Sequence, residues 1–198
     1  QIPTATVAVM VPEEADFAGN GDKNKLYNKI GNIIARKDKK RYFRGPVIGV
    51  HLRCTDNLKN PKIQTDFDEY GQVLARLLKV NKNASIFLST DNERILETYV
   101  KNYPTVISTS KFYPKDESVA IHVSAECKDK LKMAREALID LYLLANCDYL
   151  LYAGFSSFSS LAIMLSDIKK SHLYDLGSNN IASIVWKIFI GLSWMDFN

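Results

Sequence analysis

Short apolar segments alternate along the chain with segments whose apolar positions recur at helical spacing. Most of the apolar segments carry hydrophobic residues on both faces, which is typical of strands in a buried parallel sheet. The expected strands cover residues 6–11 at an edge, 47–52, 85–88, 106–108, 149–152 and, last, 171–176. A chain with this alternation folds as layers of helices around one sheet.

The helical segments are marked by apolar stripes and by start signals. A stripe that begins at Leu26 predicts a helix ending near Asp38, and Asp66 caps a second helix with a stripe from Phe67 to Leu78. Thr90 and Glu93 have the spacing of a capping box, which places a third helix directly after its strand. Two more helices are expected over residues 128–145 and from residue 161, after a turn of small residues over 153–160.

These elements predict an α/β fold, a Rossmann-like parallel sheet with helices on both faces. With 198 residues, 46% of them hydrophobic, the chain is long enough for one good core, and no composition break divides it. We therefore expect a single domain over residues 1–198. Because the sequence opens in mid-pattern on Gln1, we also expect it to be part of a longer chain.

The charge pattern, the apolar runs and the cysteine content limit which classes of binding partner and which cellular compartment we expect. Nine Lys or Arg and one acid lie between Lys23 and Arg44, within a net charge of +4, but the segment lacks the regularly interleaved aromatic residues of a nucleic-acid stacking platform. We interpret this segment as a solvated helix face and expect no nucleic-acid partner.

No apolar run reaches the roughly 18 residues of a membrane span, and no signal peptide precedes Gln1. Three widely spaced cysteines favour reduced thiols, and so the cytoplasm.

Polar residues gather where the expected strands end. His51 lies at the end of the strand over 47–52, Arg53 and Asp56 follow that strand, and Thr90 with Asp91 follows the next. Parallel strands deliver their carboxyl ends to one edge of a sheet, so these side chains are expected to line one crevice together with residues 154–160.

The segment AGFSSFSSLA, residues 153–162, places one glycine and four serines between a strand and a helix. Unpaired N–H groups at a helix start favour a phosphate, and Ser156 and Ser157 add hydroxyl donors. A serine-capped helix without a ligand explains the same residues equally well. Arg53 on the same crevice favours the phosphate, because a guanidinium binds phosphate oxygens with two parallel hydrogen bonds.

His51 and Asp140 are each open to two interpretations, a structural one and a ligand contact. His51 beside an apolar strand fits a structural histidine as well as a ligand contact. Asp140 lies in an otherwise apolar helix, where a carboxylate needs hydrogen-bond donors: either the N–H groups of a purine or a partner within the protein. Arg53 itself is able to pair with Asp56 instead of a phosphate.

Three segments together resemble the donor-binding half of the fucosyltransferases that share a His-x-Arg-Arg signature, such as the alpha-1,6-fucosyltransferases and the rhizobial nodulation fucosyltransferases. The matching segments, in order, are GVHLRCTD, IFLSTDNERILETYVKNYP and ALIDLYLLANCDYLLYAGFSSFSSLA. The resemblance implies a GT-B-type domain that binds GDP-fucose and transfers fucose with inversion to a glycan hydroxyl. It also implies that no metal or other cofactor is needed.

Carried over by position, the resemblance gives each residue a role. Arg53 is similar to the arginine on the diphosphate, His51 to a nucleoside contact and Asp140 to the carboxylate that recognises guanine. The other implied donor contacts are Thr90 and Asp91, beside the sugar, and Ser156, Ser157 and Phe158, in the turn that holds the phosphates.

The chain departs from the family pattern at two positions. Cys54 replaces the second arginine, and Pro61 lies near the place of an acidic residue that serves as base in relatives. Asp56 then becomes the candidate base that deprotonates the acceptor, with Asp66, Asp68 and Glu69 as alternatives. Two other functions therefore stay open: transfer from another nucleotide sugar, and a domain that binds nucleotide or glycan without turnover.

Overall fold

The computed structural model describes residues 43, 45–54, 67–116 and 119–177 of the chain. The strand expected over residues 6–11, the helix expected to end near Asp38 and the basic segment up to Arg44 lie outside the described residues. Asp56, the candidate base, and Asp66, the expected cap of the second helix, also lie outside them.

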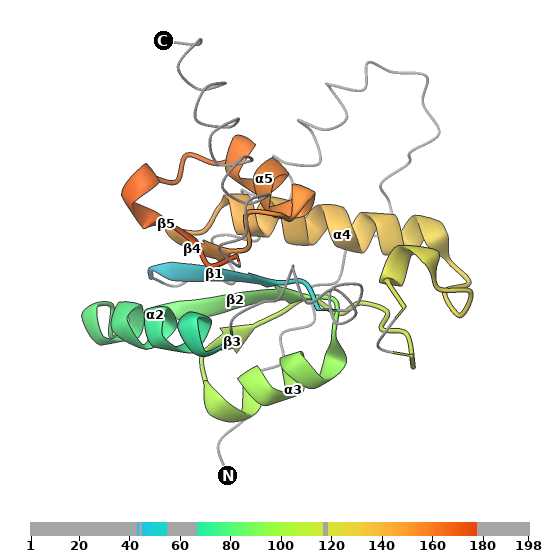
Figure 1. Cartoon of the computed structure of the whole chain (residues 1–198), viewed down its shortest axis with the longest axis horizontal. Helices are drawn as coiled ribbons and strands as arrows, with labels where there is room; N and C mark the ends of the chain where they lie inside the picture. The colour runs from blue at the N-terminus through green and yellow to red at the C-terminus, as the bar shows by residue number, and fades with distance from the viewer. Residues whose placement is uncertain (1–42, 44, 55–66, 117–118, 178–198) are drawn as a thin grey trace.

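Five parallel strands form one sheet, in the order β3-β2-β1-β4-β5 (Figure 1). The strands are β1 (Val47–Leu52), β2 (Ser85–Thr90), β3 (Val106–Ile107), β4 (Tyr149–Tyr152) and β5 (Leu173–Asp175). The prediction of a parallel, Rossmann-like sheet is confirmed for the described part of the chain.

Helices cover both faces of this sheet. In Figure 1, α2 and α3 lie on one face, and α4 and α5 lie on the other. The helices are α2 (Phe67–Val80), α3 (Glu93–Asn102), α4 (Lys130–Ala145) and α5 (Ser157–Met164), with short 3-10 helices over Ile121–Val123 and Lys170–His172. The expected layering is therefore confirmed as well.

Two helix starts differ from the prediction. β2 continues to Thr90, so the cap of α3 is Asn92, whose side-chain oxygen accepts from the Ile95 N–H at 3.1 Å. The capping box proposed for Thr90 was wrong, because Thr90 is still a strand residue. α5 begins at Ser157 rather than at Leu161, so most of the serine-rich segment is helix and not turn.

The alternation of side chains along β1 sorts them between the two faces. Ile48, Val50 and Leu52 pack with α2 and α3, whereas Val47 packs on the α4 side. Gly49 lies on the α4 side too, where a Cβ atom would stand 3.0 Å from the Cys147 sulfur. The same alternation turns His51 toward α5.

The topology marks one edge of the sheet as a binding site. From the central strand β1 the chain proceeds to β2 on one side and, after β3 and α4, to β4 on the other. In sheets of this order, ligands bind outside the carboxyl ends of the strands where the direction of winding reverses.

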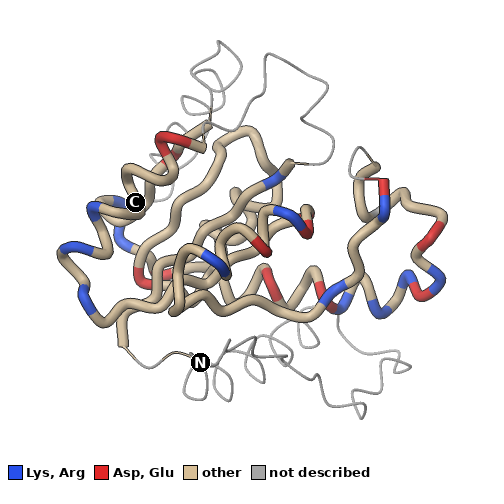
Figure 2. The backbone as a smooth tube through the Cα atoms, turned by 90° about the horizontal axis from the view of Figure 1, so that it is seen from below, with Lys and Arg blue, Asp and Glu red and all other residues tan. Residues whose placement is uncertain are grey.

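Charged residues avoid the first four strands and gather elsewhere. Figure 2 shows Lys, Arg, Asp and Glu alternating along the segment that leads into α4, while β1 to β4 contain none. The cysteines Cys54, Cys127 and Cys147 are all buried free thiols. In the described part of the chain, no helix combines the length and apolarity needed to cross a bilayer.

Candidate active site

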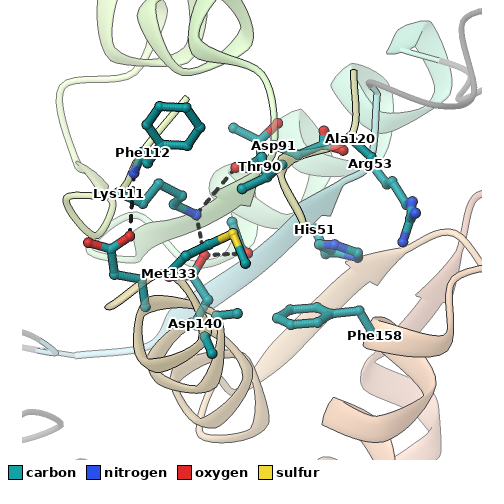
Figure 3. A pocket seen from close by; sticks show the side chains of 15 residues that line it. His51, Arg53, Thr90, Asp91, Lys111, Phe112, Ala120, Met133, Asp140 and Phe158 are labelled. Atoms are coloured by element: carbon teal, nitrogen blue, oxygen red, sulfur yellow. Dashed lines mark hydrogen bonds and ion pairs between the residues drawn. The ribbon is translucent and has the colours of Figure 1, made fainter. Parts of the chain in front are cut away.

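A cavity of about 270 Å³ lies at the carboxyl ends of β1 and β2, beside α4 and the start of α5 (Figure 3). The residues that line it belong partly to the three motifs named above and partly to the irregular segment between β3 and α4 and to α4 itself. The lining residues are His51, Arg53, Ser89, Thr90, Asp91, Lys111, Phe112, Ala120, Ile121, Met133, Ala134, Glu136, Ala137, Asp140 and Phe158.

The cavity brings together most of the side chains that the sequence placed in one crevice. These are His51, Arg53, Thr90, Asp91, Asp140 and Phe158. Ser156 and Ser157 do not line it. The Ser156 hydroxyl is buried at the cap of α5 without a hydrogen bond among the described residues, whereas Ser157 is exposed. Their phosphate-binding role stays a prediction.

His51 is fixed from two sides. Its Nδ1 atom lies 2.6 Å from the Ser159 hydroxyl of α5, and its ring lies against Phe158 with centroids 5.1 Å apart. The Tyr70 hydroxyl donates to the His51 carbonyl at 3.2 Å. Burial lowers the pKa of His51 to about 4, so the imidazole is neutral at neutral pH and offers one N–H donor and one acceptor.

Four charged groups surround this imidazole. Asp91 and Asp140 raise the pKa of His51, and Lys111 and Arg53 lower it, but desolvation exceeds all of these effects. With Glu136, which also lines the cavity, two cations and three carboxylates from the described residues face the same small space. Such a site suits a ligand with both anionic groups and polar edges.

Asp91 joins the ends of the two central strands. Its carboxylate accepts from the Cys54 backbone N–H at 2.7 Å, which ties the segment after β1 to the segment after β2. The Cys54 side chain is buried, and desolvation raises the pKa of its thiol to about 12. At the position of the signature's second arginine, this chain therefore carries a neutral group.

Asp140 reaches the cavity from α4 and is 2% exposed. Its carboxylate accepts from the Ser89 hydroxyl at 2.7 Å and from the Thr109 hydroxyl, and it forms an ion pair with Lys111. Lys111 also donates to the Thr90 carbonyl at 3.2 Å. The expected need for donors is thus met by three side chains, one from β2 and two from the segment after β3. Binding of a base stays a prediction.

Thr109 and Lys111, which contact Asp140, have no place in the sequence prediction, and Ser159 was expected at the crevice only as one of residues 154–160, without a role of its own. Thr109 follows β3, so the rule that parallel strands share one edge could have found it. Lys111 lies in the irregular segment after β3, where neither periodicity nor a motif signals a role. Ser159 was read as part of a turn, although the helical backbone directs it to His51.

Two other predictions concern metal and base. In the described ranges, no three His, Cys, Asp or Glu side chains gather as they would around a metal ion. Whether catalysis needs a metal stays a prediction. Asp68 and Glu69 are exposed in the first turn of α2 and do not line the cavity.

A family model described as the alpha-(1,6)-fucosyltransferase N- and catalytic domains matches residues 25–168. This chain belongs to that family. The match covers most of the chain, including β1, β2, α4 and β4, and it confirms the resemblance drawn from the three motifs. The cavity is therefore the candidate active site of an alpha-1,6-fucosyltransferase family member.

Solved structures of the fucosyltransferase NodZ are similar to this chain. NodZ alpha-1,6-fucosyltransferase co-crystallised with GDP is 23% identical, with a TM-score of 0.45 over 70% of this chain and 42% of NodZ. Fucosyltransferase NodZ from Bradyrhizobium is 24% identical, with a TM-score of 0.43 over 72% and 44%. This family member therefore spans less than half the length of the NodZ chains it matches.

Proposed function

We propose that this cavity binds GDP-fucose and that the chain is the GT-B-type donor-binding part of an inverting fucosyltransferase acting on a glycan hydroxyl. The observation that carries the proposal is the meeting of His51, Arg53 and Asp140 in one cavity. These are the three positions at which the family pattern implies a nucleoside contact, a diphosphate contact and a base contact. Membership in the alpha-1,6-fucosyltransferase family supports the donor class.

Arg53 has the central chemical role in this proposal. When the bond between fucose and the diphosphate breaks, negative charge grows on the leaving phosphate. A guanidinium at the cavity compensates this charge with paired hydrogen bonds, and fixed donors of this kind stabilise the transition state more than the ground state. We propose that this compensation suffices without a metal, so that EDTA leaves the turnover rate unchanged.

The neutral His51 and the start of α5 position the donor. An imidazole that stays uncharged at neutral pH is able to donate one hydrogen bond and accept another without adding charge beside the diphosphate. Phe158 holds the ring from below. The acceptor-activating base is proposed to be Asp56, which must reach the acceptor oxygen on the sugar face opposite the leaving GDP.

Calorimetric titration of the purified chain with GDP, GDP-fucose, UDP and ADP tests the donor assignment. GDP should bind more tightly than UDP or ADP. Arg53→Ala should weaken GDP binding about 10- to 100-fold, since a charged hydrogen-bonded pair contributes about 1.5–3 kcal/mol. Arg76→Ala, at an exposed position of α2, is the matched control and should bind as the parent does.

Measuring turnover distinguishes the fucosyltransferase from the other two candidate functions, transfer from another nucleotide sugar and binding without turnover. Release of GDP from GDP-fucose in the presence of a mixture of glycans, lost in Arg53→Ala, supports the transferase. Tighter binding of UDP than of GDP would instead support another nucleotide sugar. GDP binding without any release of sugar would identify a domain that binds its ligand without turnover.

A further inference from the structure

We propose that Lys111 determines base specificity in this pocket, by donating a hydrogen bond to the carbonyl oxygen of an oxo base whose neighbouring ring N–H is accepted by Asp140. The inference rests on the proposed function and deepens it. Lys111 lies outside the three motifs that carry the family resemblance, so its role here comes from the geometry alone.

The ammonium of Lys111 is fixed by two contacts at the cavity. It donates to the Asp140 carboxylate and to the Thr90 carbonyl, and both partners line the cavity with it (Figure 3). A lysine ammonium has three N–H donors. One donor of Lys111 therefore has no partner among the described residues. Because the other two contacts hold the ammonium in place, this donor is already oriented before a ligand arrives.

Asp140 has a matching free acceptor position. A carboxylate has about four lone-pair positions, and Ser89, Thr109 and Lys111 use three of them. The side chain is 3% exposed and that of Lys111 is 9% exposed, so bulk water reaches neither group freely. Ser89 and Lys111 both donate to Oδ2, so the remaining acceptor position is on Oδ1, which Thr109 also contacts, across the same carboxylate from the oxygen that binds Lys111. At this mostly desolvated place an unmatched polar group is destabilising.

An acceptor beside a donor recognises a cyclic amide edge. Guanine and hypoxanthine present a ring N–H beside a carbonyl oxygen, and both groups find partners at Asp140 and Lys111. Adenine presents a ring nitrogen acceptor toward the carboxylate and an amino donor toward the ammonium, so both contacts fail. Sites built to hydrogen-bond a group reject analogues that lack it, because buried partners are then left unpaired.

Titration of the chain with GDP, IDP, ADP and 2-aminopurine riboside 5′-diphosphate tests this role. IDP keeps the C6 oxygen and the ring N–H of GDP and lacks only its amino group, whereas the 2-aminopurine nucleotide keeps the amino group and lacks both the oxygen and the neighbouring ring N–H. The parent chain should bind GDP and IDP at least about 10-fold more tightly than the other two, because ADP and the 2-aminopurine nucleotide lose the hydrogen bonds to both Lys111 and Asp140.

Lys111→Met should remove this preference selectively. We expect affinity for GDP and IDP to fall about 10- to 100-fold, and affinity for the 2-aminopurine nucleotide to change less than about 3-fold. Lys111→Gln keeps an N–H donor, so its affinities for GDP and IDP should lie between those of the parent chain and those of Lys111→Met. It also provides the test if Lys111→Met does not fold. Lys79→Met, at an exposed position of α2, is the control and should keep all four affinities.

The outcomes separate this inference from the proposed function. Equal loss of affinity for all four nucleotides, or no loss for any, would overturn the role of Lys111 while GDP binding by the parent chain still stands. If the parent chain bound no guanine nucleotide at all, both the proposed function and this inference would be overturned.

Discussion

The two sides of the cavity hold their polar groups in different ways. On the histidine side, consisting of His51, Phe158 and Ser159, one neutral imidazole is kept in place by a hydroxyl and an aromatic ring. On the carboxylate side, consisting of Asp140, Lys111, Ser89 and Thr109, a buried charge pair is surrounded by hydroxyl donors.

Under the proposed function, the two sides would serve different parts of the donor, the diphosphate beside Arg53 and the base beside Asp140. The histidine side adds no charge near Arg53, so the guanidinium keeps its full effect on an anion. The carboxylate side carries two opposite charges that compensate each other within the protein. The polar side chains there are paired with one another, as a desolvated site requires.

The carboxylate side should be the more sensitive to removal of one group. Asp140→Ala leaves the Lys111 ammonium buried without its counter-ion, so we expect the free energy of unfolding to fall by about 3–5 kcal/mol. Urea denaturation at pH 7 measures this. Glu97→Ala, at an exposed position of α3, is the matched control and should change stability by less than about 0.5 kcal/mol.

The double variant Asp140→Ala with Lys111→Met sharpens the test. Removing both charges together should destabilise the chain less than the two single losses added, by a coupling of about 1–3 kcal/mol. If the two losses simply added, the ion pair would not be what connects this side of the cavity.

The histidine side should instead show the stronger pH dependence. The pKa of His51 is lowered from 6.5 to about 4 by burial. Between these values the unfolded chain binds a proton that the folded chain does not, so the stability of the folded state falls as the pH decreases from about 6.5 to 4. The loss should reach about 3 kcal/mol in urea denaturation, since one pKa unit corresponds to about 1.4 kcal/mol.

His51→Asn removes the titrating group and should flatten this part of the stability profile relative to the parent chain. Above pH 7, where the imidazole is neutral in both states, the difference between the two proteins should be constant. Parallel profiles below pH 6.5 would contradict a neutral, buried His51.

The turn before α5 supports the histidine side from outside the cavity. Asp175 accepts from the N–H groups of Gly154 and Gly177, at 2.8 and 3.1 Å, and a Cβ atom on Gly154 would collide with the Asp175 carboxylate. Gly154→Ala should therefore destabilise the chain by about 1–3 kcal/mol. A thermal or urea unfolding curve measures the effect.

Gly71→Ala is the matched control for this substitution. A Cβ atom at Gly71 meets nothing within 4 Å on α2, so the better helix propensity of alanine should stabilise the chain by about 0.5–1 kcal/mol. Opposite signs for the two glycines are expected. Stabilisation by both would show that Asp175 moves aside and that the turn does not depend on it.

The comparison also separates what the sequence could predict from what it could not. Apolar runs placed β1 and β2, and their polar ends placed His51, Arg53 and Asp91 at one edge, because strand direction and side-chain alternation are local properties. The start of α5 was missed because serines have weak helix preference and no apolar period. The helix forms there because Ser159 and Ala162 are buried against the rest of the fold, which outweighs the weak helix preference of the serines.

The arrangement of the carboxylate side could not be predicted, because it depends on contacts that no local sequence pattern encodes. Asp140 was recognised as a buried carboxylate in need of donors, yet its partners come from positions 89, 109 and 111, and the last of these lies in an irregular segment. Periodicity carries no information on where such a segment returns to the sheet. A lysine there is expected to be solvated, and only the folded arrangement reveals it as part of the site.

The smallest expected effect belongs to Ser159. Ser159→Ala removes the hydroxyl partner of the His51 Nδ1 atom, and we expect a loss of about 0.5–1.5 kcal/mol in stability, the usual contribution of one hydrogen bond. The imidazole then loses the contact that fixes its ring and its tautomer. GDP should bind a few-fold more weakly, whereas Ser159→Thr, which keeps a hydroxyl, should restore most of the affinity.

Ser160→Ala is the control, because among the described residues the Ser160 hydroxyl donates to the carbonyl of Ser156, the cap of α5, and not to the histidine. Equal effects at both serines would mean that Ser159 serves the helix and not the histidine. A loss of GDP affinity confined to Ser159→Ala would instead show that the histidine side acts through a single positioned imidazole. The two sides of the cavity would then differ in redundancy as well as in charge, since Asp140 has three partners and the His51 ring nitrogen has one.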